Sequence, residues 1–330
     1  MEVCVVSLGG IIQKLTAPDR SGSYDDVVLG FDAPDRYAAG HPYFGALIGR
    51  YGNRIRSGRF LLDETEYVLA TNDGKNHLHG GRRGFDEVEW DIERLAGEPD
   101  TALRLSYVSA DGEEGYPGRL NVAVTYSLTD RDELRIDYSA ITDRPTPVNL
   151  TSHVYFNLAG QGADTVLDHE VEIYASHFTP VCEALIPTGS IQSVDGTPMD
   201  FRTRTAIGER IDDSYEQLQL AGGYDHNWAL DKEPGDLAIA ARVLEPSSGR
   251  QLEVYTTEPG LQFYTGNGLD GSIRGKQDRS YVSRAGFCLE TQHYPDSPNQ
   301  PAFPSTILMP GEVYETTTVY RFTATKTTNR

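Results

Sequence analysis

The sequence has little cysteine and no long apolar run, and each shortage excludes a class of protein. Its three cysteines cannot all pair and show no metal-ligand spacing, which suits a reducing cytoplasm rather than a disulfide scaffold. The first residues, MEVCVVSLGGII, lack the positive start and the long apolar run of a signal peptide. No segment approaches membrane-spanning length. We therefore expect a cytoplasmic protein that has no membrane partner.

Positive charge is also scarce. The chain has 29 basic residues, of which five are lysine, against 49 acidic residues, and its formal net charge is −20. Because nucleic acids attract basic proteins, neither DNA nor RNA is an expected partner. The composition fits adaptation to a salty cytoplasm and equally a GC-rich genome that favours arginine codons, and we prefer neither.

Short alternating runs between turn residues fill the sequence instead. In the clearest case, apolar and polar residues alternate over 120–128, a turn follows at 129–133, and the pattern resumes at 134–138. Residues 60–62 and 66–69 form a second predicted hairpin. Such runs are typical of antiparallel sheets.

The chain is long enough to bury a large core, since it has 330 residues of which 38% are hydrophobic. No stretch between Gly9 and Phe322 resembles a linker. We predict one all-β domain over residues 1–330, a large many-stranded antiparallel β-sandwich. Short helices are predicted around 34–38 and 204–212.

The segment Val148–Leu158, VNLTSHVYFNL, alternates without a break and predicts a strand with one apolar and one polar face. His153 lies in the middle of the polar face, beside Asn and Tyr rather than the Lys, Glu and Thr of a solvent-facing strand. Two interpretations stay open. The histidine is buried and satisfied by its neighbours, or it lines a cleft and transfers protons, for which its ordinary pKa is suited.

The segment Gly286–Gln292, GFCLETQ, predicts another strand, with Cys288 and Glu290 on one face. Burying a carboxylate without a partner is costly, so Glu290 needs a reason. It forms an ion pair with an arginine of a neighbouring strand, or it is a general base whose pKa is tuned by burial. Cys288 shares its face, but no histidine or helix terminus beside it suggests an activated thiolate.

Five further segments accompany these two strands. They are FGALIGRYGNRI (44–55), NHLHGG (76–81), GFDEVEW (84–90), GYDHNWAL (223–230) and GLQFYTGN (260–267). In this order and at this spacing, the set resembles the aldose 1-epimerase family, the mutarotases, over nearly the whole chain. The resemblance implies a broad β-sandwich with its site on a concave sheet face. It also implies an isomerase that interconverts the α and β anomers of a free aldose, a hexose such as galactose or glucose.

In that family a glutamate takes the proton from the C1 hydroxyl while a histidine protonates the ring oxygen, so the ring opens and can reclose. Carried over to this sequence, the resemblance implies Glu290 as the base, His153 as the acid, and His79 near the ring oxygen. It implies that the sugar hydroxyls are held by Asn53, Arg54, Asp225 and Gln262. The family mechanism needs no cofactor and no metal.

The chemistry of these side chains agrees with such a ligand. Planar amide, guanidinium and carboxylate groups read vicinal hydroxyls well, and the C–H faces of a sugar pack on aromatic rings. By strict alternation Phe156 and Phe263 belong to the core. Tyr155 and Tyr264 are therefore the better cleft candidates.

Other histidines give weaker signals. His77 and His79 are two apart, which would place both imidazoles on one face of a strand, but no HExxH or CxxC spacing supports a metal site. We therefore expect no metal. Surface or loop positions are expected for His41, His169, His177 and His293.

Three rivals to a free-aldose epimerase stay open. A hexose-phosphate 1-epimerase would use an arginine cluster for the phosphate, although even spacing on a probable strand would turn three of its first four members to solvent. That cluster consists of Arg50, Arg54, Arg56 and Arg59 with Arg82 and Arg83. A sugar-binding protein without turnover would have no need of acid and base together. A glycosidase would use Glu290 and Asp225 as its two carboxylates.

The expected partner is a small-molecule sugar, bound by a monomer or a homodimer. The choice among aldoses depends on loops such as 195–205 and 268–284, because loops place the polar groups that distinguish epimers.

Overall fold

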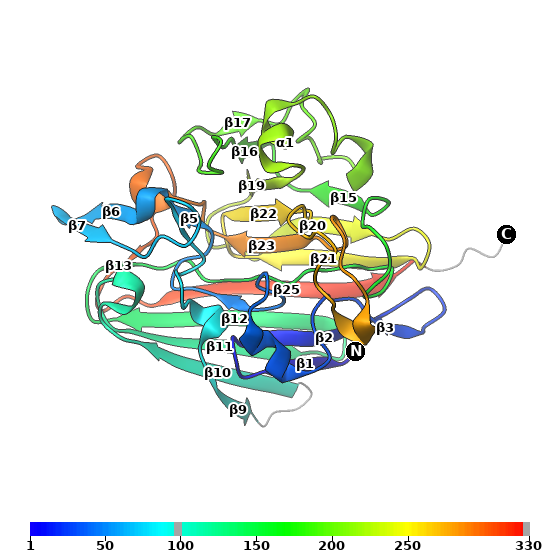
Figure 1. Cartoon of the computed structure of the whole chain (residues 1–330), viewed down its shortest axis with the longest axis horizontal. Helices are drawn as coiled ribbons and strands as arrows, with labels where there is room; N and C mark the ends of the chain where they lie inside the picture. The colour runs from blue at the N-terminus through cyan, green and yellow to red at the C-terminus, as the bar shows by residue number, and fades with distance from the viewer. Residues whose placement is uncertain (96–100, 326–330) are drawn as a thin grey trace.

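The computed structural model describes residues 1–95 and 101–325, which form antiparallel sheets joined by loops (Figure 1). The largest sheet has nine strands in the order β18-β15-β20-β21-β25-β12-β11-β10-β9. Their bounds are β9 Asp91–Leu95, β10 Thr101–Ser109, β11 Leu120–Leu128, β12 Glu133–Thr142, β15 Glu170–Ile173, β18 Thr205–Ala206, β20 Ala238–Leu244, β21 Arg250–Thr256 and β25 Tyr314–Ala324. Within the described residues, no helix is long and apolar enough to cross a membrane.

A five-stranded sheet packs against this large sheet. Its order is β17-β16-β19-β22-β23, with bounds β16 His177–Thr179, β17 Gln192–Ser193, β19 Asp225–Ala229, β22 Gly260–Tyr264 and β23 Cys288–Gln292. Ile136 of β12, Val254 of β21 and Leu289 of β23 belong to one buried apolar cluster. The two sheets therefore share a core, which confirms the predicted all-β sandwich.

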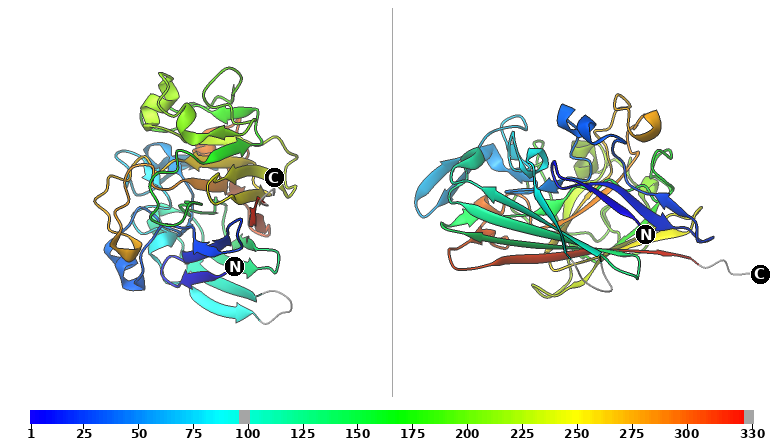
Figure 2. Two further views of the ribbon diagram at one scale, coloured as in Figure 1. Left: turned by 90° about the vertical axis from the view of Figure 1, so that its right-hand side faces the viewer. Right: turned by 90° about the horizontal axis from the view of Figure 1, so that it is seen from below.

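Shorter strands complete the architecture. The N-terminal sheet comprises β1 Val3–Val6, β2 Ile11–Pro18 and β3 Tyr24–Asp26. Two-residue strands pair β4 Leu47–Ile48 with β14 Thr151–Ser152, β5 Arg54–Ile55 with β8 His77–Leu78, and β13 Thr146–Pro147 with β24 Ile307–Leu308. In the right-hand view of Figure 2, the long strands curve beneath the N-terminal strands.

Both predicted hairpins are confirmed. Strands β11 and β12 pair along their length, and β6 Arg59–Leu62 pairs with β7 Thr65–Val68. The predicted first helix is a 3-10 helix, Pro34–Ala39. The second prediction was largely wrong, because 204–212 contains only one 3-10 turn, Ile207–Glu209, and the α-helix α1, Glu216–Ala221, follows it.

The predicted strand Val148–Leu158 is wrong in its extent. Only Thr151–Ser152 is a strand, and isolated bridges lie at Asn149 and Phe156. The segment changes partners along its length, since the His153 N–H donates to the Ala46 carbonyl and the Phe156 N–H to the Phe287 carbonyl. Residues 148–158 therefore form no long strand, because no single neighbouring segment runs beside them for more than a few residues.

Candidate active site

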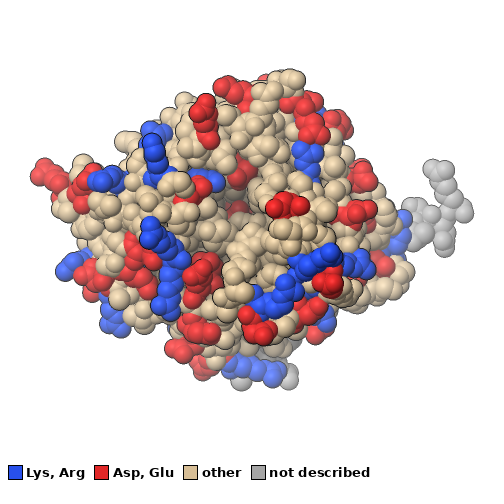
Figure 3. Space-filling model, in the orientation of Figure 1, with Lys and Arg blue, Asp and Glu red and all other residues tan. Residues whose placement is uncertain are grey.

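A pocket of about 180 Å³ collects most of the predicted site residues. It is lined by Pro42, Tyr43, Asn53, Arg54, Leu78, His79, His153, Tyr155, Asp225, Tyr264 and Glu290. The lining comes from the ends of β5, β8 and β14, from strands β19, β22 and β23 of the five-stranded sheet, and from the loop that carries Tyr43. Figure 3 shows a hollow near the middle of the face seen in Figure 1, with acidic side chains beside it. Segments far apart in sequence therefore meet at one polar cavity.

Strand register explains which residues face the pocket from the sheet. Asp225, Tyr264 and Cys288 lie opposite one another. Two residues further along the strands, and so on the same face, Gln262 lies between Asn227 and Glu290. Directly opposed residues share a face, so the sheet presents these side chains together. Gln262 is not in the pocket lining, but its Nε2 donates to Asp225 Oδ1 at 2.7 Å and orients that carboxylate.

Glu290 is buried, with 2% of its surface exposed. Burial, aided by the negative charge of Asp225, raises the pKa of its carboxyl well above the ordinary value. Its Oε1 lies 3.7 Å from His153 Nε2, and its Oε2 has no hydrogen-bond partner among the described residues. The expected structural explanation, an ion pair with a strand arginine, does not apply: Arg54 Nε instead pairs with Asp73 Oδ2 at 2.7 Å.

His153 is also buried, and burial lowers the pKa of its imidazole to about 3. Its Nδ1 lies 3.5 Å from Cys288 Sγ. A histidine therefore does stand beside Cys288, contrary to the expectation from sequence, because a segment distant in the chain brings it there. Burial raises the pKa of the Cys288 thiol well above the ordinary value, so the sulfur stays protonated.

His79 and Asn53 hold each other by two hydrogen bonds. Both have left-handed backbone, with φ of 52° and 61°. The Asn53 N–H donates to His79 Nδ1 and the His79 N–H to the Asn53 carbonyl, each at 3.1 Å. Burial lowers the pKa of His79, so the ring is neutral and its proton is on Nε2. His79 can thus donate a hydrogen bond to a bound ligand.

The expectation that His77 and His79 share a face was wrong. His77 Nδ1 lies 2.7 Å from the Ala70 carbonyl and its Nε2 lies 2.6 Å from the Tyr116 hydroxyl, away from the pocket. The left-handed φ of His79 breaks the alternation that an extended strand would impose.

Three possible metal-ligand atoms, one each from His79, His153 and Glu290, lie within 4.8 Å of one another. His79 uses its Nδ1 lone pair for the Asn53 N–H and carries its proton on Nε2. A neutral ring in that tautomer donates hydrogen bonds rather than ligating a metal. The arrangement therefore fits proton chemistry better than a metal centre.

The structure also corrects the arginine cluster. Arg50 is buried and its Nη1 donates to the carbonyls of Pro117 and Gly118 at 2.9 and 2.8 Å. Only Arg54 of the cluster lines the pocket. Arg50 therefore supports the fold, and the prediction that even spacing turns it to solvent was wrong.

Further expectations need correction. His169 was expected at a surface or loop position: it lies in a loop, but it is buried, and its Nε2 accepts the Leu158 N–H at 3.0 Å. The loops 195–205 and 268–284 do not contribute to the pocket lining. Tyr43 does, and sequence reasoning missed it although it directly precedes the FGALIG segment.

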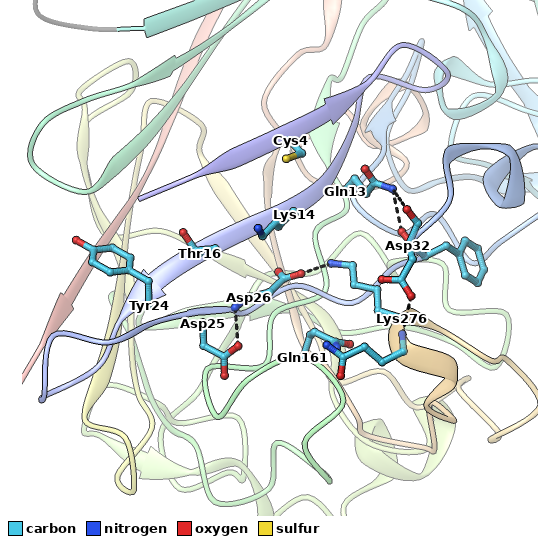
Figure 4. Close-up of a pocket in the computed structure, with 12 residues that line it drawn as sticks. Cys4, Gln13, Lys14, Thr16, Tyr24, Asp25, Asp26, Asp32, Gln161 and Lys276 are labelled. Atoms are coloured by element: carbon cyan, nitrogen blue, oxygen red, sulfur yellow. Dashed lines mark hydrogen bonds and ion pairs between the residues drawn. The ribbon is translucent and has the colours of Figure 1, made fainter.

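A second cleft, of about 430 Å³, lies between β2, β3 and the loop that carries Lys276 (Figure 4). Lys276 is buried, with its Nζ 2.6 Å from Asp26 Oδ2, and it donates to the Val28 carbonyl at 2.8 Å. Gln13 Nε2 similarly donates to the carbonyls of Phe31 and Asp32. The polar side chains that line this cleft largely form hydrogen bonds and ion pairs within the protein. None of the predicted site residues lines it.

Comparisons with known proteins identify the family of the chain. A family model described as aldose 1-epimerase matches residues 1–321. The chain is 50% identical over 322 residues to galactose mutarotase from Bos taurus, covering 98% of this chain and 91% of that protein. It is 39% identical over 329 residues to aldose 1-epimerase from Escherichia coli (strain K12), covering 98% and 92%.

Solved structures give the same answer. An aldose epimerase homologue from C. elegans matches with a TM-score of 0.89 at 31% identity, covering 98% of this chain and 96% of that one. Galactose 1-epimerase from Lactobacillus acidophilus matches with a TM-score of 0.85 at 27% identity, covering 98% and 91%. By sequence and by fold, the chain belongs to the aldose 1-epimerase family.

Proposed function

We propose that this protein is an aldose 1-epimerase, an isomerase that interconverts the α and β anomers of a free hexose such as galactose or glucose. The observation that carries the proposal is the approach of the Glu290 carboxyl group to the His153 imidazole, 3.7 Å apart in a pocket lined with amide, guanidinium and carboxylate groups. Relatives named galactose mutarotase and aldose 1-epimerase support it. Residues 1–330 act as one domain in this proposal.

Ring opening needs one base and one acid. Glu290 takes the proton of the C1 hydroxyl, the C1–O5 bond breaks with its electron pair moving to O5, and His153 delivers a proton to O5. The product is the open-chain aldehyde. Rotation about C1–C2 and reclosure through the reverse proton transfers give the other anomer.

The number of protons held by Glu290 and His153 together fits this cycle. Burial raises the pKa of Glu290 and lowers the pKa of His153, which favours a neutral carboxylic acid beside a neutral imidazole. That pair holds the same number of protons as a carboxylate beside an imidazolium. Burial thus favours the protonation state that ring opening produces, and in this proposal the bound sugar favours the charge-separated form.

Binding groups surround the reacting centre. His79 Nε2 donates to the ring oxygen, and Arg54, Asp225 and Asn53 hold hydroxyls in this proposal, with Gln262 orienting Asp225. The rings of Tyr155 and Tyr264 line the pocket and offer surfaces for sugar C–H groups. The free cysteines Cys4, Cys182 and Cys288 support the proposal of a cytoplasmic protein, acting as monomer or homodimer.

Polarimetry of freshly dissolved α-D-galactose and α-D-glucose tests the proposal. We expect Glu290→Gln and His153→Asn each to lower kcat by about 100- to 10,000-fold, the scale of a lost general acid or base, with less effect on KM. Glu66→Gln, at an exposed glutamate, serves as the control. Near-normal turnover in Glu290→Gln would refute the role of the base. Release of sugar from a methyl galactoside, whose C1 hydroxyl is blocked, would indicate a glycosidase instead.

Hexose-phosphate 1-epimerase is a second candidate, because one observation favours it. A neighbouring cleft of about 520 Å³ shares Arg54 with the pocket and includes Arg56 and Lys75, although Asp73 and Glu183 also line it. Comparing kcat/KM for hexose and hexose 6-phosphate separates the candidates, since a phosphate site must favour the phosphorylated sugar.

A further inference from the structure

Two tyrosine rings stack on the imidazole of His153. Its centroid is 5.6 Å from that of Tyr43 and 5.0 Å from that of Tyr155, with interplanar angles of 29° and 28°. His79 and Tyr264 approach edge-on, at 5.2 and 6.3 Å. Two tyrosine rings therefore lie nearly parallel to the imidazole, while its Nε2 lies 3.7 Å from Glu290 Oε1.

Tyr43 is held in this place by an uncommon backbone. Its φ of 63° is left-handed, which is costly for an aromatic residue and persists where the surroundings fix it. The Gly45 N–H donates to the His153 carbonyl at 3.0 Å, which ties the Tyr43 loop to the His153 segment. The Tyr43 ring also lies 4.6 Å from the ring of His79. One side chain thus touches both pocket histidines.

Aromatic faces attract cations, and the attraction grows where water is excluded. In the proposed cycle His153 must carry a positive charge before it protonates the ring oxygen, while its burial opposes that charge.

The other groups around His153 differ in their effect on its positive charge. Glu290 and Cys288 face it from β23, His79 from the end of β8 and Tyr264 from β22, with Arg54 and Asp225 across the pocket. His41 lies farther off and disfavours the charge slightly. Ionised Glu290 favours the imidazolium, and Arg54 opposes it.

We propose that Tyr43 is a positioning residue which, together with Tyr155, stacks on the His153 ring and stabilises its protonated form. This inference rests on the proposed function of His153 as the acid. It assigns Tyr43 a role through its ring rather than through its hydroxyl. The conservative variant Tyr43→Phe should therefore keep the effect, and an aliphatic side chain should lose it.

The test compares Tyr43→Phe with Tyr43→Leu by polarimetry and by NMR titration of ¹⁵N-labelled His153. We expect kcat of Tyr43→Leu to fall by about tenfold, the equivalent of one unit in the His153 pKa, with little change in KM. The His153 titration should move to lower pH in Tyr43→Leu and stay in place in Tyr43→Phe. Tyr24→Leu, at an exposed tyrosine of β3, controls for the substitution itself.

The outcomes separate this inference from the proposed function. Equal kcat and equal His153 titration in the Leu and Phe variants would overturn the inference while leaving mutarotation intact. Absence of mutarotation in the unchanged protein would overturn the proposed function, and the NMR titration would still decide whether the rings stabilise the imidazolium. If Tyr43→Leu fails to fold, Tyr43→Met, with a longer side chain to fill the space, takes its place with the same expected shift.

Discussion

The two large sheets of this protein treat buried polar groups differently. In the nine-stranded sheet, buried residues of β11 and β12, most of them apolar, alternate with less buried residues that are mostly polar. In the five-stranded sheet, β22 and β23 are buried almost throughout, and one face is polar. Within the described residues, thirteen buried side-chain nitrogen or oxygen atoms lack a hydrogen-bond partner: six lie on β19, β22 and β23, and one lies on the nine-stranded sheet.

This difference indicates that the nine-stranded sheet is a structural scaffold and that the five-stranded sheet carries the candidate active site. Each buried polar group without a partner costs about 1 to 3 kcal/mol, so a purely structural sheet avoids such groups. Their concentration beside Glu290 and Gln262 is what a sheet needs if ligand hydroxyls or ordered water are to complete its hydrogen bonds. We therefore expect substitutions in the nine-stranded sheet to change stability, and those on the polar face of the five-stranded sheet to change catalysis.

The largest expected effect is on stability. Ile136 lies on β12 and is fully buried, so Ile136→Ala should lower the free energy of unfolding by about 2 to 5 kcal/mol and leave kcat of the folded protein unchanged. Ile141 on the same strand is 48% exposed, and Ile141→Ala should stay within about 0.5 kcal/mol of the original. Urea denaturation measures both. A fall in kcat that parallels the loss of stability would break the division between scaffold and site.

A smaller effect is expected on sugar binding. Asp225→Asn keeps the shape of the side chain but removes its charge, so we expect KM to rise by about tenfold, the scale of a hydrogen bond to a charged group. Because the Asp225 charge helps raise the pKa of Glu290, the variant should also lower that pKa. Asp137→Asn, on the nine-stranded sheet beside Arg135, is the control and should change neither quantity. A large fall in kcat at unchanged KM would instead indicate that Asp225 takes part in the chemical step.

Sequence alone could predict those features that local pattern determines. The β11–β12 hairpin follows directly from period-two alternation, and so does the division of Tyr155 from Phe156 between pocket and core. The resemblance to a family supplied Glu290 and His153 as the acid–base pair, and the structure brings the two side chains together. Their roles in turnover remain predictions.

Features that depend on contacts between distant segments were beyond the sequence pattern. Arg50 and Arg54 are four residues apart, yet one is satisfied by backbone carbonyls in the core and the other lines the pocket. Nothing in their spacing distinguishes them, because the carbonyls come from residues 117 and 118. The left-handed backbone of Tyr43 similarly arises from tertiary packing, since an aromatic residue rarely adopts it. Histidine adopts this conformation more readily than most residues, but nothing in the local pattern singles out His79 for it.

The smallest expected effect concerns the stability of the site itself. The pKa of Glu290 is raised in the folded protein, so the native state holds this proton more tightly than the unfolded chain does. Ionisation therefore opposes folding, and this destabilisation appears as pH rises above about 4.5, the carboxyl's ordinary value. Glu290→Gln cannot ionise. At neutral pH we expect it to be more stable than the original by about 0.5 to 2 kcal/mol, with the difference vanishing below pH 4.

Thermal unfolding of both proteins at pH 4 and pH 8 measures that difference, with Glu66→Gln, at an exposed position, as the control. A lower Tm for Glu290→Gln at pH 8 would mean that the protein stabilises the carboxylate more than water does. The pocket would then be built for a resident anion rather than for a base that gains and loses a proton. A higher Tm together with lost turnover would show that the Glu290 carboxylate destabilises the fold and is also needed for catalysis. On the five-stranded sheet, unlike the nine-stranded one, a residue would then lower stability in return for activity.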